Sequence, residues 1–464
     1  MNRTALSAFV CAAVLCTFGP HAVNAEDRVN AMVLEASGVT DDDIKAAESK
    51  KAVSLFDAFA LSVRNTEALP IIGENVIQSR SVRNQAIGAY LPKVSLNAAR
   101  PIPDNNPPSG ATGSLPSKTY AYIYARQPII TGLNELSGIE LASKSESISR
   151  NTLALTAQQQ FLLISQKYYL VCQLQETLKT DRDIIDLYRK NRGELVRRVS
   201  VGKNRQNDVL STDAQIARLD AQIISITSQL ETARNDLISS AGLRADTDIA
   251  GGIDLPPPSF TPDDTRTAAY KRYEVLIAQQ NVELAGINLK AAWGGHLPTV
   301  YLEGNYRLYN ESKVDADKFY AAITASLPIF NGGITQEKVS QAESMKRQAN
   351  LNLSQTVRTV EESIRTSYDT WNSAVKQSDA YKRALESAER NYNVTMNDYR
   401  LNLVTILEVI TALTNLQQAR NDYSAALLSA GLARIHLGTS IGEFPGGGNS
   451  VLRNAPLIKT GDAR

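Results

Sequence analysis

Long intervals without proline constrain the fold of this chain more than any other feature of its sequence. Its 17 prolines occur in clusters, and none falls within residues 129–255 or 329–444. Residues 334–430 also contain no glycine, so neither of the two residues that most disfavour a helix interior interrupts them. A helix over residues 334–399 would be about 100 Å long at a rise of about 1.5 Å per residue. Helices of that length must pack along one another.

Apolar positions in these intervals recur at coiled-coil spacing. Ser367 and Ser378 interrupt the pattern, and small residues are frequent. This composition favours helices packed around a wide lumen over a tight two-stranded coil. The main seam steps by three and four through Val357, Val360, Ile364, Trp371, Ala374, Tyr381, Leu385, Ala388 and Tyr392.

The proline-rich segments show a period of two, which is typical of strands with one face in lipid or in a protein core and the other in water. The alternation predicts strands over residues 94–98, 119–125, 300–307 and 321–327. The polar positions Glu303, Asn305 and Arg307 are expected to face a lumen. The face expected to meet lipid carries Val94, Leu96, Val300, Leu302, Ile323 and Ala325.

The two halves of the chain are copies of one unit. Residues 89–96 recur 206 positions later as 295–302, and residues 127–132 recur 200 positions later as 327–332. Each half is predicted to run helix, strand, strand, long helix, turn, long helix. The expected divisions are a signal peptide (1–25), an N-terminal extension (26–50), a first repeat (51–250), a Pro/Gly-rich linker (251–264), a second repeat (265–443) and a flexible C-terminal tail (444–464).

The first 25 residues have the three parts of a secretory signal. Arg3 forms the basic region, an apolar stretch of residues 4–18 follows, and Val23-Asn24-Ala25 is a small-residue cleavage site. Cleavage would leave equal numbers of acidic and basic residues, a balance that gives no electrostatic footprint for nucleic acid. Only Cys172 would remain among the cysteines, which excludes a disulfide within the chain, and neither a metal site nor a cofactor is indicated.

Two short matches to enzyme motifs lack the context that the chemistry needs. Ser373 and Lys376 fit S-x-x-K, but they lie within a segment predicted to be helical, and the K-T-G of residues 459–461 ends the chain. Gly202-Lys203 lacks the glycine that a phosphate-binding loop has five residues upstream. The chain is therefore not expected to be an enzyme.

The ordered set of repeats, Leu-Pro-x-Val strand starts and Pro-Ile-x-x-Gly strand ends resembles the TolC family of outer-membrane efflux and secretion channels. The resemblance spans residues 52–442. It implies a homotrimer in which four strands per protomer close a twelve-stranded outer-membrane barrel above a periplasmic tunnel of long helices. It also implies a passive exit duct for efflux or type I secretion, driven by an inner-membrane transporter through a periplasmic adaptor. Drugs, peptides and secreted proteins remain equally possible cargoes.

Turn residues mark the two expected hairpin tips, Val201-Gly202-Lys203 and Leu401-Asn402-Leu403. Glycine and asparagine readily adopt the left-handed conformation that a helix reversal needs. By resemblance, these tips dock the adaptor. The alternatives are that they are bare solvent-facing turns, or that Gly202 and Asn402 only interrupt a bent helix.

The gate is expected just beyond the tips, where Asp208 and Glu408 would each form a ring of three carboxylates. By resemblance, Tyr399 and Asp208 match a tyrosine and an aspartate that hold neighbouring helix pairs together in the closed state. The family's gate arginine falls at Val404, so Lys203, Arg205 or Arg400 would have to replace it. The alternative is that Asp208 and Glu408 only cap the helices that follow the turns.

A structural coiled-coil protein of the cell envelope is the alternative function. It would account for the helices but not for the four alternating strands or the duplicated Leu-Pro strand starts. A urea or high-salt wash of outer membranes separates the two hypotheses, because only an integral barrel stays in the membrane.

Overall fold

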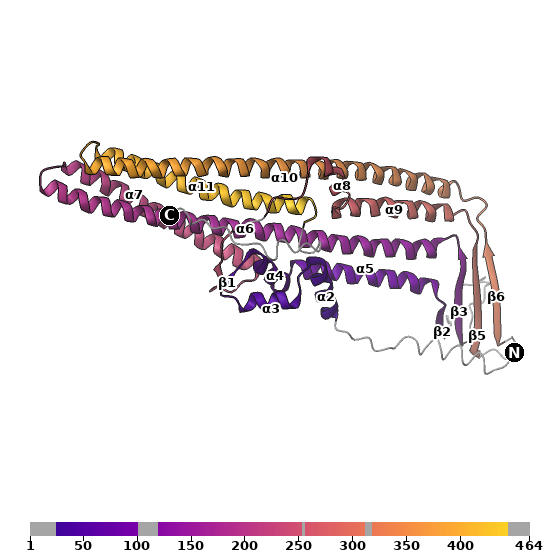
Figure 1. The fold of residues 1–464 in the computed structure, drawn as a ribbon. Helices are drawn as coiled ribbons and strands as arrows, with labels where there is room; N and C mark the ends of the chain where they lie inside the picture. The colour runs from indigo at the N-terminus through magenta and orange to yellow at the C-terminus, as the bar shows by residue number, and fades with distance from the viewer. Residues whose placement is uncertain (1–24, 101–118, 253–255, 311–317, 444–464) are drawn as a thin grey trace, which may run out of the picture.

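The computed structural model describes residues 25–100, 119–252, 256–310 and 318–443. In these residues the molecule is elongated, with a β-sheet at one end, two helical hairpins reaching to the other end and short N-terminal helices along its middle (Figure 1). The prediction of a mainly helical chain with one sheet of four strands is confirmed.

The repeated unit is visible as two matching series of elements. The first consists of α5 (Ala68–Tyr90), β2 (Lys93–Ala99), β3 (Tyr120–Thr131), α6 (Asn134–Ser200) and α7 (Gln206–Ala241). The second consists of α9 (Tyr273–Gly294), β5 (Thr299–Asn310), β6 (Phe319–Ser326), α10 (Ile334–Arg400) and α11 (Ile406–Ser440). Helices α6 and α10 each contain 67 residues. Helix α10 contains neither proline nor glycine, and α6 contains no proline and only two glycines, Gly138 and Gly193. Each helix begins directly after a turn that contains glycine.

Of the nine predicted seam positions, four are buried and four are half-buried. Val360, Ile364, Ala374 and Leu385 of α10 are all buried. Tyr381 departs from the pattern, because it is 39% exposed in the single chain. Helix α6 packs against α5 and α7 of its own repeat and against α9 and α11 of the other, so it joins the two repeats.

The four-stranded sheet is antiparallel and has the order β2-β3-β5-β6. Its register puts Leu302 opposite Ile323 and Val300 opposite Ala325, so the four side chains share a face as the alternation predicts. On the other face Glu303 forms an ion pair with Arg126, with 3.1 Å between Glu303 Oε1 and Arg126 Nε. The outermost strands β2 and β6 each pair on one side only.

Strand β3 is longer than the sequence pattern predicts. It continues past Ala125 to Thr131, because residues beyond Arg126 pair with the first residues of β5. The register shifts between Pro128 and Ile130, where proline has no N–H to give to a ladder. This bulge hides the alternation that the prediction relied on.

The N-terminal residues form a core with the first repeat. Helix α2 (Ala25–Ser37) packs against α5 and α6, α4 (Leu55–Asn65) packs against α6 and α7, and α3 (Asp41–Ser49) packs against α4. Their buried side chains, such as Val33, Ile44 and Phe59, share one core. Cys172 of α6 is buried in the same core. The hydroxyl of Tyr168 lies 3.0 Å from the carbonyl oxygens of both Val53 and Gly251.

Short elements complete the connection between the repeats. Strands β1 (Ala52–Val53) and β4 (Asp248–Ile249) pair in parallel, a contact that the sequence does not predict. The 3-10 helix η1 (Pro262–Asp264) lies at the end of the expected linker, and α8 (Thr265–Ala269) follows it. The expected signal peptide, apart from Ala25, and the expected C-terminal tail lie outside the described residues. Within the described part of the chain, no helix is both long and apolar enough to cross a membrane.

Candidate functional site at the hairpin tips

Both helix pairs reverse direction through the same turn. Gly202 has φ +73° and Asn402 has φ +60°, the left-handed conformation that ends a helix. The N–H of Lys203 donates to the carbonyl of Arg198 at 2.9 Å, and two hundred residues later the N–H of Leu403 donates to Asp398 at 2.9 Å. The chain therefore forms two true hairpins at Gly202 and Asn402, and neither position is a bend within one helix (Figure 1).

The turns present apolar side chains to solvent. Val201 is 67% exposed, Leu401 68% and Leu403 71%, and Lys203 beside them is also exposed. Apolar side chains gathered at the end of a rigid hairpin are typical of a surface that binds another protein. All six residues predicted for docking lie on the two turns.

Asp208 and Glu408 both cap helices. The Asp208 carboxylate accepts the backbone N–H of Arg205 at 3.2 Å, and the Glu408 carboxylate accepts the N–H and the hydroxyl of Thr405 at 3.1 and 3.0 Å. These bonds satisfy donors that the first turn of a helix leaves free. The capping role is thus present within one chain.

Tyr399 lies in the core that joins the two hairpins, 4% exposed. The guanidinium of Arg198 lies over its ring, 4.5 Å from the centroid. Burial raises the pKa of the Tyr399 hydroxyl, while the nearby Arg198 charge opposes that rise. The phenol therefore stays protonated at neutral pH and can donate a hydrogen bond.

Arg198 also binds the opposite turn through its nitrogen atoms. Its Nη1 donates to Asn402 Oδ1 at 2.8 Å and to the carbonyl of Tyr399 at 3.4 Å, and its Nη2 donates to the carbonyl of Arg400 at 3.4 Å. Sequence reasoning proposed Lys203, Arg205 or Arg400 as the basic partner and missed Arg198. No sequence pattern could identify it, because Arg198 and Tyr399 are 201 residues apart and meet only when the hairpins pack.

Asn204 connects the tyrosine to the first hairpin. The Tyr399 hydroxyl donates to Asn204 Oδ1 at 3.5 Å, and Asn204 Nδ2 donates to Asp208 Oδ2 at 3.2 Å. The structure therefore brings Tyr399 and Asp208 together through one intervening side chain. Glu408 lies outside this chain of bonds, and Val404, at the position of the family's arginine, packs partly buried in the apolar core beneath the turns.

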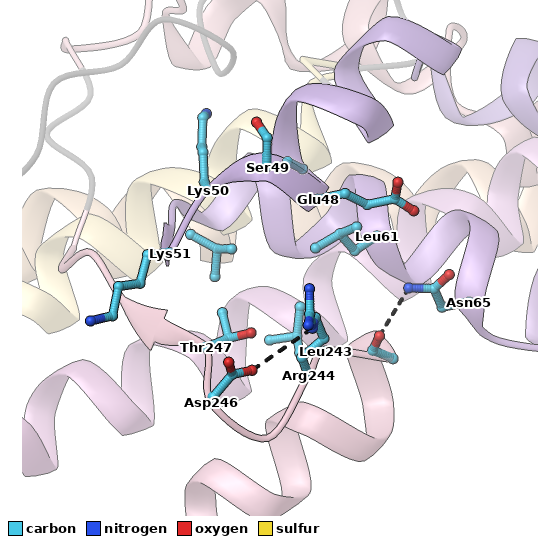
Figure 2. A pocket seen from close by; sticks show the side chains of 13 residues that line it. Glu48, Ser49, Lys50, Lys51, Leu61, Asn65, Leu243, Arg244, Asp246 and Thr247 are labelled. Atoms are coloured by element: carbon cyan, nitrogen blue, oxygen red, sulfur yellow. Dashed lines mark hydrogen bonds and ion pairs between the residues drawn. The ribbon is translucent and has the colours of Figure 1, made fainter.

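A cavity of about 460 Å³ lies far from the tips, between the α3–α4 connection and the end of α7. Lysine, arginine and acidic side chains surround it, and the Asn65 amide donates to the carbonyl of Gly242 at 2.9 Å across one end (Figure 2). Lys50 is held by Asp57 at 2.8 Å, and Glu48 is held by Arg64 at 3.5 Å. Both ion pairs join the α3 segment to α4, whereas the Asn65–Gly242 bond joins α4 to the end of α7. The cavity therefore lies at the junction of the N-terminal helices with the first repeat.

Comparison with known proteins agrees with this architecture. Residues 266–443 match the model of the family described as "Outer membrane efflux protein". "Outer membrane protein TolC" of Salmonella enteritidis is 22% identical over 378 residues, covering 78% of this chain and 76% of the relative. The protein of the same name from Escherichia coli K12 is 24% identical over 391 residues, with the same coverage.

Solved structures show the same fold. The outer membrane protein VceC of Vibrio cholerae superposes with a TM-score of 0.72 at 16% identity, covering 84% of this chain and 96% of that one. The CmeC outer membrane channel of Campylobacter jejuni gives a TM-score of 0.72 at 15% identity, covering 84% and 86%.

Proposed function

Because the chain belongs to the outer membrane efflux protein family, a family of channels and not of enzymes, we propose that this outer-membrane channel is a passive exit duct completed by three copies. An inner-membrane transporter drives it through a periplasmic adaptor. The cargo leaves by efflux or type I secretion.

The open sheet carries the proposal of an oligomer. One chain supplies four strands with an apolar outer face, and its outermost strands β2 and β6 each keep one unpaired edge. Free N–H and C=O groups at a lipid-exposed edge cost several kcal/mol each, so a membrane sheet must close on itself. Three copies close it, in keeping with the trimers that TolC-like channels form.

The two tips are the proposed docking surface for the adaptor. The docking residues are Val201, Gly202, Lys203, Leu401, Asn402 and Leu403. Their exposed apolar side chains support this role, and the two turns have the same backbone geometry. An adaptor with one repeated binding site could therefore bind both turns.

The gate is proposed to lie directly behind the docking surface. Tyr399 and Asp208 hold the two hairpins of a protomer together through Asn204, and Glu408 supplies a second ring of carboxylates. Adaptor binding at the turns would pull on Arg198, which bonds to three groups of the opposite tip. Docking and opening would thus act on the same few side chains.

Site-specific crosslinking in cells tests this function. A cysteine in place of Lys203 should form an adduct with an adaptor subunit when cells are treated with a short bifunctional thiol–amine reagent. Lys346→Cys is the matched control, because it is an exposed lysine on α10 about 80 Å from the tip at about 1.5 Å per residue. An adaptor adduct with Lys346→Cys alone, or with neither variant in assembled channels, would remove the tips from the interface.

The envelope coiled-coil hypothesis is tested by extraction. An integral channel stays in outer membranes washed with urea, whereas a peripheral coiled coil is released. The four-stranded sheet and its apolar face favour retention.

A further inference from the structure

Two glycines meet where the repeats join, at the junction between the sheet and the long helices. Gly132 follows β3 and Gly294 ends α9, and each lies so close to the other that a Cβ on either would collide with the other's carbonyl oxygen. Gly132 has φ +60°. This backbone contact fixes the first repeat against the second.

Each of these glycines has an exact structural counterpart in the other repeat. Gly294 accepts the N–H of Leu297 at 3.0 Å, and Gly88 accepts the N–H of Leu91 at 3.2 Å. The other contact partner, Gly132, corresponds to Gly332, which has φ +70°. The following residues also match, because Ser137 donates to Leu133 at 2.8 Å as Glu337 donates to Gly333 at 3.1 Å.

The counterparts make no such contact with the described residues of the same chain. Among those residues, a Cβ on Gly88 or on Gly332 would find no atom within 4 Å. Gly88 is near the edge strand β2, whereas Gly332 follows the opposite edge strand β6. The two glycines that would form a second contact of this kind therefore lie at opposite edges of the chain, where they cannot meet each other.

The segment after β6 also lacks the neighbour that its counterpart in the first repeat has. Ile329 is 96% exposed and Phe330 88%, whereas their counterparts Ile129 and Ile130, which lie beside β5, are 45% and 49% exposed. Strand β6 ends at Ser326, the counterpart of Arg126, although β3 continues to Thr131. Residues 327–331 thus lack the neighbouring strand that orders residues 127–131.

We propose that a second copy of this chain supplies that neighbour, with Gly332 of one copy packed against Gly88 of the next. Residues 327–331 then extend β6 and pair with β2 of the second copy. The inference rests on the proposed function, because it specifies the contact that closes the sheet. It goes further by fixing which residues face one another.

The register follows from the pairing of β3 with β5. Within the chain Gln127 lies opposite Leu302, and Ile130 lies opposite Val300 across the bulge. Residues of β3 have their counterparts 200 positions later, around β6, and residues of β5 have theirs 206 positions earlier, in β2. The same pairing between two copies therefore puts Leu327 opposite Leu96 and Phe330 opposite Val94. Both derived pairs join apolar side chains that are more than half exposed in the single chain.

Disulfide formation between copies tests the register. In a Cys172→Ala background, the pair Leu327→Cys and Leu96→Cys should form disulfides between copies when the assembled protein is oxidised, because side chains directly opposite lie about 5 Å apart. The linked copies should remain together as covalent oligomers on a denaturing gel without reductant. Leu327→Cys with Val94→Cys is the control, since a diagonal pair lies about 7 to 8 Å apart and should link at least about tenfold less. Trimers in which the control pair links equally well, or neither pair links, overturn the register.

A glycine substitution tests the backbone contact. Gly88→Val should lower the yield of assembled trimer about tenfold, because overpacking at a close contact is repeated at three interfaces. Gly193→Val in α6 is the control, since a Cβ there also meets no atom of the residues that the structure describes. Both variants should retain wild-type helix content by circular dichroism. Equal trimer yields would overturn the contact, whereas a wild-type protein that forms no trimer would refute the proposed function itself.

Discussion

The Tyr399 hydroxyl and the Asp208 carboxylate belong to different hairpins and share one bridging side chain. Asn204 accepts from the tyrosine at 3.5 Å and donates to the aspartate at 3.2 Å. The same aspartate caps α7, so the bridge is attached to the start of a helix. Moving the two hairpins apart therefore requires the bond between Tyr399 and Asn204 to break.

The first prediction concerns closure. Tyr399→Phe combined with Asp208→Ala should raise the closed-state conductance of single channels, because both ends of the bridge are lost, and Asn204→Ala alone should have a similar effect. Tyr188→Phe is the control. Its hydroxyl bonds Thr414 at 2.9 Å within the same core but away from the turns. If Tyr188→Phe raises the conductance as much, the effect belongs to the packing of the core and not to the bridge.

The second prediction separates charge from capping at Glu408. Glu408→Gln keeps an oxygen that can accept the Thr405 N–H, yet it removes the negative charge. Both Glu408→Gln and Glu408→Ala should weaken cation selectivity, measured as the reversal potential across a salt gradient. Selectivity that changes only in the alanine variant would assign Glu408 to capping alone.

The third prediction concerns Arg198, which contacts the ring and the backbone of the opposite tip. Arg198→Lys should weaken the contact between the two hairpins by about 1 kcal/mol, because an ammonium group cannot reproduce the forked contacts of a guanidinium. Limited proteolysis should cut the α10–α11 turn several-fold faster in this variant. Arg197→Lys, at the exposed neighbouring position, should leave the cutting rate unchanged, and equal acceleration in the two variants would contradict the assignment.

The fourth prediction tests the two faces of the sheet. Leu302→Arg places a charge on the apolar face, at a cost of roughly 2 to 4 kcal/mol near the bilayer midplane. Asn305→Arg places it on the polar face, where Glu303 and Arg126 already form an ion pair. The Leu302 variant should give far less assembled channel in membranes. Similar yields would reverse or remove the assignment of the faces.

The fifth prediction concerns Glu146, whose carboxylate is nearly buried between α5 and α6. Burial alone would raise its pKa, but bonds from Arg150 and Arg80 and the charge of Arg83 outweigh burial and hold the pKa below its usual range. A carboxyl with a depressed folded pKa stabilises the protein above its unfolded pKa, and this contribution is lost as the pH falls through the folded value.

Glu146→Gln should therefore lower stability by about 1 to 2 kcal/mol at neutral pH. The loss should shrink below about pH 4, which thermal unfolding across a pH series would reveal. Glu140→Gln is the control, because its pair with Lys290 at 3.6 Å is largely exposed and contributes little. A constant loss across the pH series would show that the carboxylate charge is not responsible.

The sequence predicts the long helices and the faces of the strands well, because both depend on local properties. Absence of breakers predicts the helical run, and the turn residue Asn402 places the end of α10 within one residue of the predicted Tyr399. Alternation assigns Leu302 and Ile323 to one face, and the register agrees. Periodicity fails where the backbone departs from regular geometry, as at the Pro128 bulge.

The candidate site is only partly predictable. Gly202 and Asn402 mark the turns because their local conformation demands such residues. Arg198 and Asn204 acquire their contacts only through packing of segments about two hundred residues apart. The extension expected at residues 26–50 likewise proves to contain core residues such as Ile44, whose partners lie on other helices.

The equal lengths of α6 and α10 couple the evolution of the two repeats. One inserted residue would advance a tip by about 1.5 Å and rotate everything beyond it by about 100°. The insertion would therefore expose a buried apolar seam to water. It would also displace one tip along the helix axis relative to the other. An insertion of seven residues, close to two turns, nearly restores the orientation. We therefore expect ducts of this kind to lengthen in steps that nearly restore the orientation, such as seven or eleven residues, made in both repeats and in the returning helices α7 and α11 as well.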